Sequence, residues 1–380
     1  MSKQAKVGIA GVIAVFLLAV PLGMVLAAEA GPPPVQVHGY MQNRVYLGPG
    51  ATPEFRSERI SVSATAALPD DSTAYVELYY HPWASASGLY LESAYYETAL
   101  GAGKIRVGKG RRITFGITPA YPNRRTSNYG LVSEAFTQDR IQGVQYTIQK
   151  NALDAAVGIH TGYRLGVRQI GEVPGDTIRN QKYSVPHLCF RDPVSGGGTP
   201  ESRLSSKLDV SARLGGRWEN GLKAGVSALV GRLDDGDLQN LRTEKNVLAP
   251  GTSPALLPGA TSKTKRVLAF DYTYKHPEGF VTQGEFYAGK VSSLKYNAWN
   301  FLVGWEPPAG WKFFLRYAQQ NMGSAANPAN PLSWDTRQLS ISAVQPLRKG
   351  LWMQYEMEIN TEKPGSVSNN IFFVELFSGF

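Results

Sequence analysis

Apolar and polar residues alternate along most of the chain from residue 35 onward. The pattern is clearest at 208–214, 299–305, 351–359 and 372–376, where every second residue is apolar. A period of two residues is typical of a β-strand with one apolar face. No segment carries a stripe at helical spacing of similar strength, so the pattern predicts an all-β chain.

The alternating segments number about sixteen. Most are about 10–13 residues long, the length that a tilted strand needs to cross a bilayer. This length and number predict a transmembrane antiparallel β-barrel. The expected strands are 35–46, 55–68, 72–81, 89–100, 104–113, 140–150, 152–162, 204–218, 222–232, 265–276, 279–290, 296–307, 310–320, 335–346, 351–361 and 368–380.

The connections between these segments alternate in length. Each even-numbered segment is followed by a tight turn, such as 69–71 or 219–221, whose Asp, Asn, Gly or Pro residues suit positive or fixed φ. The links after odd-numbered segments are mostly longer, and the longest are 114–139, 163–203 and 233–264. A barrel with short periplasmic turns and long extracellular loops has this alternation of short and long connections.

A soluble β-sandwich or propeller also contains alternating strands. Neither explains why large aromatic residues gather beside the short turns, where the interfacial girdle of a membrane barrel lies. The residues in question are Trp218, Tyr274, Phe280, Trp305 and Trp311.

The first thirty residues have the features of an export signal. Lys3 and Lys6 precede an apolar run, 7–26, and Ala28-Glu29-Ala30 fits a small-x-small cleavage site. The alternative is a retained single-span anchor. Cleavage predicts a signal peptide at 1–30 and an outer-membrane barrel at 31–380. Removing two lysines and one glutamate lowers the formal net charge from +9 to +8.

Export and net charge together narrow the partners that we expect. A basic chain can bind nucleic acid, anionic lipid or anionic solutes, and export argues against nucleic acid. The sequence ends in Phe380, preceded at alternate positions by Leu376, Val374 and Phe372. An aromatic end on an amphipathic strand resembles the signal that the outer-membrane barrel assembly machinery reads, so Phe380 is the candidate assembly signal.

Signs of catalysis and of metal binding are weak. The five histidines are scattered without ligand spacing, so neither a metal nor a cofactor is expected. Gly101-Ala102-Gly103-Lys104 lacks the first glycine and the Ser/Thr of a phosphate loop and is interpreted as a hairpin turn. His160 falls in the lumen phase, away from the face that a lipid hydrolase would use. We therefore expect a protein that is not an enzyme.

Several short motifs resemble the phosphate-selective porin family. They are 92–97 (ESAYYE), 104–109 (KIRVGK) with Phe115-Gly116, 139–145 (DRIQGVQ) and 284–287 (GEFY). The resemblance implies a sixteen-stranded, usually trimeric channel whose third loop folds into the pore. The sequence departs from the family pattern at Lys109 and Arg111-Arg112, which leaves the solute open.

If the apolar phase of each strand faces lipid, the other phase faces the lumen. On that phase, strands 104–113 and 204–218 carry six cations and one anion, whereas 351–361 and 368–380 carry three glutamates and no cation. We expect a field across the lumen that favours anions on one side. The acidic wall would consist of Glu356, Glu358 and Glu375.

Loop 114–139 is the candidate constriction, because it is long and is stiffened by two prolines. Its arginines, together with those of strand 104–113, would offer bidentate donors to phosphate or carboxylate. The alternative places Arg124 and Arg125 on an outer loop in contact with lipopolysaccharide. The candidate pore-lining residues are Arg106, Arg111, Arg112, Arg124, Arg125, Arg213, Arg217 and Tyr121.

Lys109 and Arg111 fall in the same phase as the lipid-facing Ile105 and Val107. A lipid-facing charge costs about 2–4 kcal/mol at mid-depth. Either Gly108 or Gly110 marks a bulge that changes the phase, or the two cations lie at the rim or in a subunit interface.

Three functions remain open from the sequence. The first is a passive diffusion channel with a modest preference for small anions. The second is a structural or surface-attachment barrel with a plugged lumen, which the three long loops would also fit. The third is a barrel enzyme, for which the sequence offers no nucleophile.

Overall fold

The structure is a computed structural model. It describes residues 34–47, 53–68, 70–80, 89–117, 125–126, 130–137, 140–161, 166–169, 184–187, 207–243, 257–323, 333–365 and 370–380. The expected signal peptide at 1–30 and its cleavage site lie outside the described residues.

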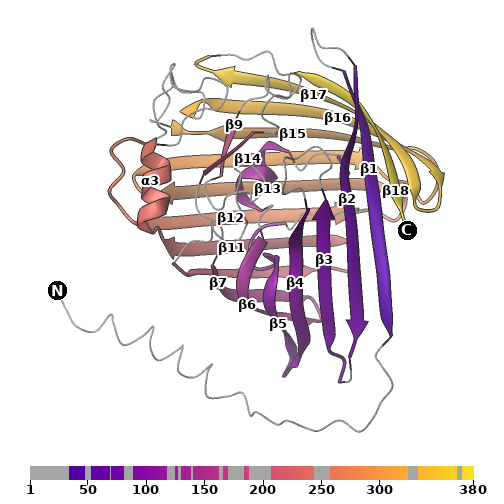
Figure 1. The fold of residues 1–380 in the computed structure, drawn as a ribbon, viewed down its shortest axis with the longest axis horizontal. Coiled ribbons are helices and arrows are strands. Elements are labelled where there is room, and N and C mark those ends of the chain that lie inside the picture. Colours follow the sequence, from indigo (N-terminus) through magenta and orange to yellow (C-terminus); the bar gives the residue numbers. More distant parts are fainter. Residues whose placement is uncertain are drawn as a thin grey trace. The chain divides into compact units, whose positions relative to one another are not determined.

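Sixteen antiparallel strands close into one barrel (Figure 1). Each strand pairs with its neighbour in sequence, and β1 pairs with β18 to close the ring. The strands are β1 (Val35–Leu47), β2 (Glu54–Ala67), β3 (Thr73–Tyr80), β4 (Leu89–Leu100), β5 (Gly103–Arg111), β6 (Arg140–Lys150), β7 (Leu153–Thr161), β10 (Asp209–Arg217), β11 (Leu222–Arg232), β12 (Thr264–Lys275), β13 (Phe280–Val291), β14 (Leu294–Trp305), β15 (Lys312–Asn321), β16 (Asp335–Arg348), β17 (Leu351–Lys363) and β18 (Ile371–Gly379).

The expected fold is confirmed strand by strand. The ranges 89–100, 140–150 and 222–232 coincide with β4, β6 and β11. The largest displacement is at β10, which begins at Asp209 and not at 204. The alternation of apolar and polar residues therefore located every strand of the barrel.

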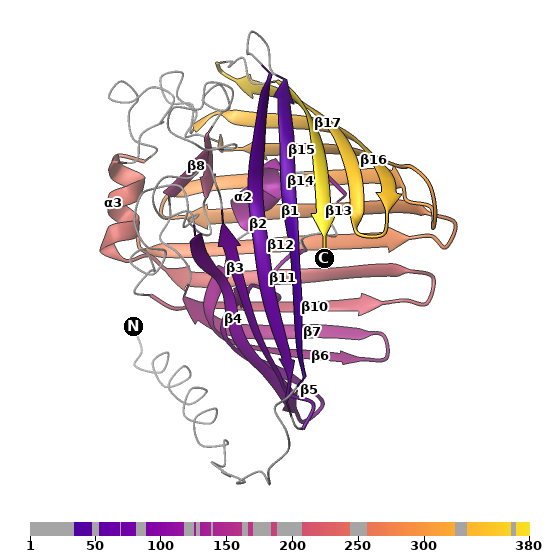
Figure 2. The same cartoon turned by 45° about the vertical axis from the view of Figure 1, so that its right-hand side comes forward.

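The tight turns gather at one end of the strands, here called the short-turn end (Figure 2). Asp70 and Asp71, with φ of 61° and 56°, join β2 to β3, and Asn151, with φ of 53°, joins β6 to β7. Asp and Asn tolerate this left-handed backbone better than other side chains. The opposite end, here called the long-loop end, holds most of the longer connections.

The long connections contain structure that the alternation did not predict. A short helix, α2 (Leu131–Phe136), follows β5, and α3 (Asp235–Thr243) follows β11. Two short strands, β8 (Gly166–Gln169) and β9 (Ser184–His187), pair with each other between β7 and β10. The described segments contain no helix that is long and apolar enough to cross a membrane.

The two faces of the barrel differ as the alternation requires. Apolar side chains such as Leu268, Phe286 and Leu315 are exposed on the outer face. Trp218, Phe280, Trp305 and Trp311 are also exposed and flank short turns, where the aromatic girdle was expected. Most of the buried polar and charged side chains lie on the inner face.

Phe380 completes the seam between the first and last strands. Its backbone N–H donates to the carbonyl of Gly39, and its carbonyl accepts from the N–H of Gly39, both at 2.9 Å. A Cβ at Gly39 would lie 2.3 Å from Cζ of Phe380 and 2.7 Å from the carbonyl oxygen of Ser61. Only glycine therefore fits at residue 39 with this seam intact.

We expect Gly39→Val to destabilise the closed barrel by about 2–4 kcal/mol, through overpacking and the loss of two backbone hydrogen bonds. Heat-modifiability on SDS gels would show unfolding at a lower temperature. Gly259→Ala is the matched control, because a Cβ at Gly259 meets no atom within 4 Å. Equal melting of the two variants would contradict a role for this seam.

Candidate functional site

The loop after β5 runs along the inside of the barrel. Its described residues reach strands β10, β11, β13, β15 and β16. Its wall contacts are Thr114 with Ser211, Gly116 N–H to Ser227 Oγ at 3.1 Å, Ile117 N–H to Glu285 Oε1 at 3.0 Å, Arg125 to Gln283 Oε1 at 3.2 Å, Thr126 with Arg316, and Leu131 N–H to Gln338 Oε1 at 3.3 Å. Loop 114–139 therefore folds into the lumen over the part that the structure describes.

Helix α2 is held against the wall by an apolar core within the barrel. Phe136 stacks on Tyr287 of β13, with 4.5 Å between ring centroids and an interplanar angle of 9°. Leu131 and Ala135 are fully buried, and apolar side chains of β11 to β15 and of α3 complete the same cluster. This core closes part of the lumen towards the long-loop end.

Gly130 lets the loop pass close to a buried arginine of the wall. A Cβ at Gly130 would lie 2.3 Å from Cζ of Arg316, and the residue has a φ of 84°. The Arg316 guanidinium donates to Ser340 Oγ at 2.9 Å and also to Thr126. Arg316 therefore links the loop to β15 and β16.

The basic residues of β5 and β10 have acidic partners on other strands of the barrel. Arg106 is 2.7 Å from Glu97, Arg217 is 3.0 Å from Asp154, and Arg213 is 2.6 Å from Asp271. The expected six cations and one anion are the side chains of these two strands alone, whereas Glu97 and Asp154 stand on the adjacent strands β4 and β7. Carboxylates of other strands therefore offset the cations of this wall.

The cations at the top of β5 lie within the barrel. Arg112 is 1% exposed, and its guanidinium donates to the carbonyl of Phe136 at 3.3 Å. Lys109 is 5% exposed and donates to the carbonyl of Leu91 at 2.7 Å. Both are inaccessible to lipid.

Gly108 has a φ of 129°, and the pairing of β5 with β4 and β6 continues through it without a register shift. Arg106, before it, faces the lumen, and Arg111, after it, lies close enough to the buried Glu92 to interact electrostatically. The burial of Lys109 does not fit a side chain exposed to lipid, whereas a bulge at Gly108 or Gly110 stays a prediction.

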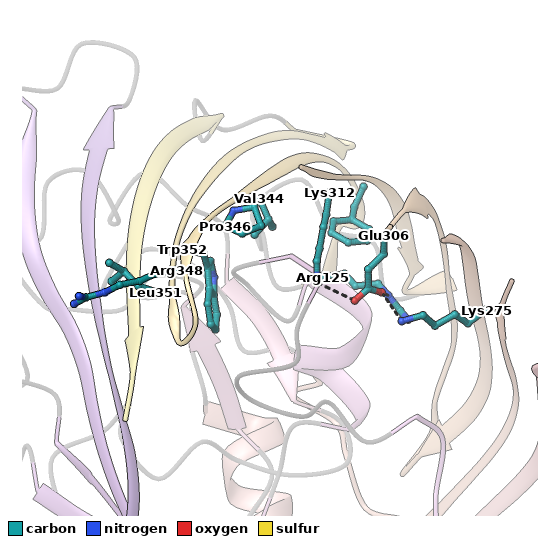
Figure 3. A pocket seen from close by; sticks show the side chains of 10 residues that line it. Arg125, Lys275, Glu306, Lys312, Val344, Pro346, Arg348, Leu351 and Trp352 are labelled. Atoms are coloured by element: carbon teal, nitrogen blue, oxygen red, sulfur yellow. Dashed lines mark hydrogen bonds and ion pairs between the residues drawn. The ribbon is translucent and has the colours of Figure 1, made fainter. Parts of the chain in front are cut away.

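Arg125 brings the loop to the short-turn end (Figure 3). Its Nε is 3.4 Å from Glu306, which also lies 3.2 Å from Lys312 and 3.7 Å from Lys275. Partial burial raises the pKa of Glu306, but the three cations outweigh it and hold this pKa below its ordinary value of 4.5. Arg124 and Tyr121 lie outside the described residues.

This ion pair predicts an acid-sensitive loop. The lowered pKa keeps Glu306 charged at pH values below 4.5, and the anchor is lost as the pH falls through this lowered pKa. We expect single-channel conductance to change only in this acid range, and Glu306→Gln to show the acid behaviour already at neutral pH. Glu278→Gln, at an exposed carboxylate of the same barrel end, is the control. An unaltered acid transition in Glu306→Gln would contradict the anchor.

The three glutamates of the expected acidic wall are buried. Glu356 and Glu358 on β17 are 0% exposed, and Glu375 on β18 is 1% exposed. Glu375 accepts hydrogen bonds from Gln42 and, at 2.6 Å, from Arg44 of β1. Glu375 therefore has a cation beside it from β1, the strand that pairs with β18.

A Ser–His pair inside the barrel bears on the enzyme alternative. His160 Nε2 is 2.9 Å from Ser211 Oγ, but both residues are 1% exposed and Ser211 also bonds Thr114 of the loop. The pair thus helps to hold the loop against the wall and is closed to a substrate. Among the described residues, no group of three or more His, Cys, Asp or Glu could hold a metal ion.

A closed sixteen-stranded barrel with a loop folded into its lumen is the architecture of an outer-membrane porin. Comparison with solved structures supports this fold. OmpF of Salmonella typhi, in complex with daunomycin, aligns with a TM-score of 0.60 and 11% identity over 92% of this chain and 98% of that chain.

Two further porin-like structures are similar. The outer-membrane channel DcaP of Acinetobacter baumannii gives a TM-score of 0.57 and 14% identity over 93% of this chain and 100% of that chain. An anion-selective porin from Comamonas acidovorans gives a TM-score of 0.57 and 11% identity over 91% of this chain and 99% of that chain. At these identities the likeness establishes the fold. No protein-family model and no curated protein matches the sequence.

Proposed function

We propose that this chain is an outer-membrane porin, a passive diffusion channel for small hydrophilic solutes with a modest preference for anions such as phosphate and carboxylates. The observation that carries the proposal is the loop after β5, which hydrogen-bonds to the inner wall from β10 to β16 and narrows the lumen. A narrowed, polar lumen selects solutes by size and charge.

Charge supports the preference for anions. The chain has a formal net charge of +9, and Arg106, Arg125, Arg213 and Arg217 lie on or beside the inner wall. Each of them is paired with an acid, so the preference is modest. The similarity to an anion-selective porin agrees with this proposal, and the motifs at 92–116 extend it to the phosphate-selective type.

The proposal includes an export route and partners. The segment 1–30 acts as a signal peptide, and the assembly machinery inserts the barrel through Phe380. The exposed apolar face contacts outer-membrane lipid, and the long loops contact lipopolysaccharide. A similar structure, OmpT of Vibrio cholerae, is described in a trimer form (TM-score 0.55, 13% identity, 92% of this chain and 100% of that chain), and we propose a homotrimer here.

A barrel with a plugged lumen is the second candidate. It is favoured by the apolar cluster of Phe115, α2, α3 and strands β11 to β15, whose side chains are at most 6% exposed. Such a core is unusual in a lumen that is otherwise polar. If this apolar core extends across the whole cross-section of the lumen, the barrel is structural and closed to solutes.

Liposome swelling separates the two functions. Proteoliposomes that contain the refolded barrel should swell in small sugars and, faster, in small anions of the same size. A plugged barrel would give the swelling rate of protein-free liposomes, although it would resist SDS when unheated. That second result would overturn the channel.

A further inference from the structure

The lumen has an apolar band at the short-turn end. Its first part consists of Val281, Leu302, Phe314 and Val344, one from each of the strands β13 to β16, and Trp352 of β17 packs against it. Trp352 also packs against a second cluster of Phe377, Tyr40 and Tyr79 from β18, β1 and β3. The interior wall of a porin is normally polar, so the band departs from the rule. Departures of this kind concentrate at functional positions.

A recess of ≈ 470 Å³ opens beside this band (Figure 3). Phe314, Val344 and Trp352 form part of its apolar lining, and its charged lining consists of Arg125, Lys275, Lys312, Arg348 and Glu306. Four cations against one carboxylate leave a net positive charge. The volume lies in the range of small-molecule sites, which combine apolar walls with a few polar groups.

Trp352 presents a flat surface to this recess. Phe377 stacks on the indole with 3.9 Å between centroids and an interplanar angle of 13°. Phe377 does not line the recess, whereas Trp352 does and is only half-buried. The part of the indole that lines the recess therefore offers an aromatic surface to a second ring.

The cations line the same recess as the indole, so one solute that fills the recess meets both. Lys312 belongs to the strand that carries Phe314, and its ammonium group is 3.2 Å from Glu306. Glu306 is shared among three cations, so their charge exceeds what one carboxylate neutralises. A second carboxylate fits this excess.

We propose that this recess binds small carboxylates that carry a flat aromatic ring, and that it thereby makes such solutes preferred substrates of the channel. The ring stacks on Trp352, and the carboxylate meets Lys312 and Arg125. The substrate class rests on the proposed function, because passage requires an open lumen. The binding site itself does not.

The test measures benzoate binding to the detergent-solubilised barrel by calorimetry, which needs no conduction. We expect benzoate to bind at least about tenfold more tightly than acetate, and more tightly than the neutral ring of benzyl alcohol. Trp352→Leu should weaken benzoate binding about threefold to tenfold, and Trp352→Phe should restore part of it. Lys312→Gln should weaken benzoate and leave benzyl alcohol unchanged.

Trp311→Leu is the matched control, because Trp311 is exposed on the outer face near the same barrel end and its loss should leave binding unchanged. Equal affinities for benzoate and acetate, or wild-type affinity in both Trp352→Leu and Lys312→Gln, would overturn the site and assign the band to packing alone. If Trp352→Leu fails to fold, Lys312→Gln decides. Benzoate binding in a barrel that does not swell liposomes would keep the site and reject the channel, whereas swelling without benzoate binding would do the reverse.

Discussion

Phe136→Ala is expected to release α2 from the barrel wall and to raise the conductance of the channel. Phe136 is fully buried and stacks on Tyr287 at 4.5 Å. Its truncation should cost about 3–5 kcal/mol, and every 1.4 kcal/mol changes an equilibrium about tenfold. The ratio of docked to undocked loop should therefore fall at least about a hundredfold, with larger and noisier current steps.

Phe313→Ala is the matched control for this prediction. Phe313 is 52% exposed on the outer face of β15, so its truncation removes the same atoms without touching the lumen. We expect the conductance of Phe313→Ala to equal that of the wild type. Equal conductance in both variants would show that the docking of α2 does not limit passage.

Neutralising Arg106 and Arg125 together should reverse the preference for anions. Their partners, Glu97 and Glu306, would remain inside the lumen with one cation fewer beside each of them. A unit charge about 8 Å away in water contributes about 0.5 kcal/mol, so two contribute about 1 kcal/mol. That is about a fivefold change in the local concentration of an anion. Reversal potentials should be measured at low salt, where screening is weak.

The acidic partners provide the control for this double variant. Adding Glu97→Gln and Glu306→Gln removes both pairs completely, so the permeability ratio should return close to the wild-type value. A ratio that is the same in all three proteins would place the selectivity elsewhere in the lumen. In that case neither arginine, although both lie on the inner side of the barrel, would be in the ion path.

The strands could be predicted from the sequence because their information is local. Alternation at 351–359 and turn residues such as Asp70 and Asn151 report on their own segment. The hairpin at Gly101–Gly103 was likewise identified as a turn, and Gly101 has the positive φ that such a turn needs.

The lumen could not be predicted in the same way, because its contacts join distant residues. Asp154 and Arg217 are 63 positions apart and meet only because β7 pairs with β10. Helix α2 spans six residues, too few to show a helical period, and the wall that buries it lies more than 90 positions further along the chain. Arg112 is buried because α2 docks against the wall and places the carbonyl of Phe136 beside its guanidinium. Gly108 has the positive φ that a bulge can use, but neither ladder of β5 shifts register there, so the expected phase change stays a prediction.

A planar bilayer recording of the wild-type protein tests the central claim most directly. We predict stable conductance steps. Across a salt gradient, we predict a reversal potential whose sign shows that anions pass modestly more readily than cations. Bilayers that stay silent, although SDS-resistant barrel is shown to have inserted, would contradict the claim that a passage remains beside the docked loop.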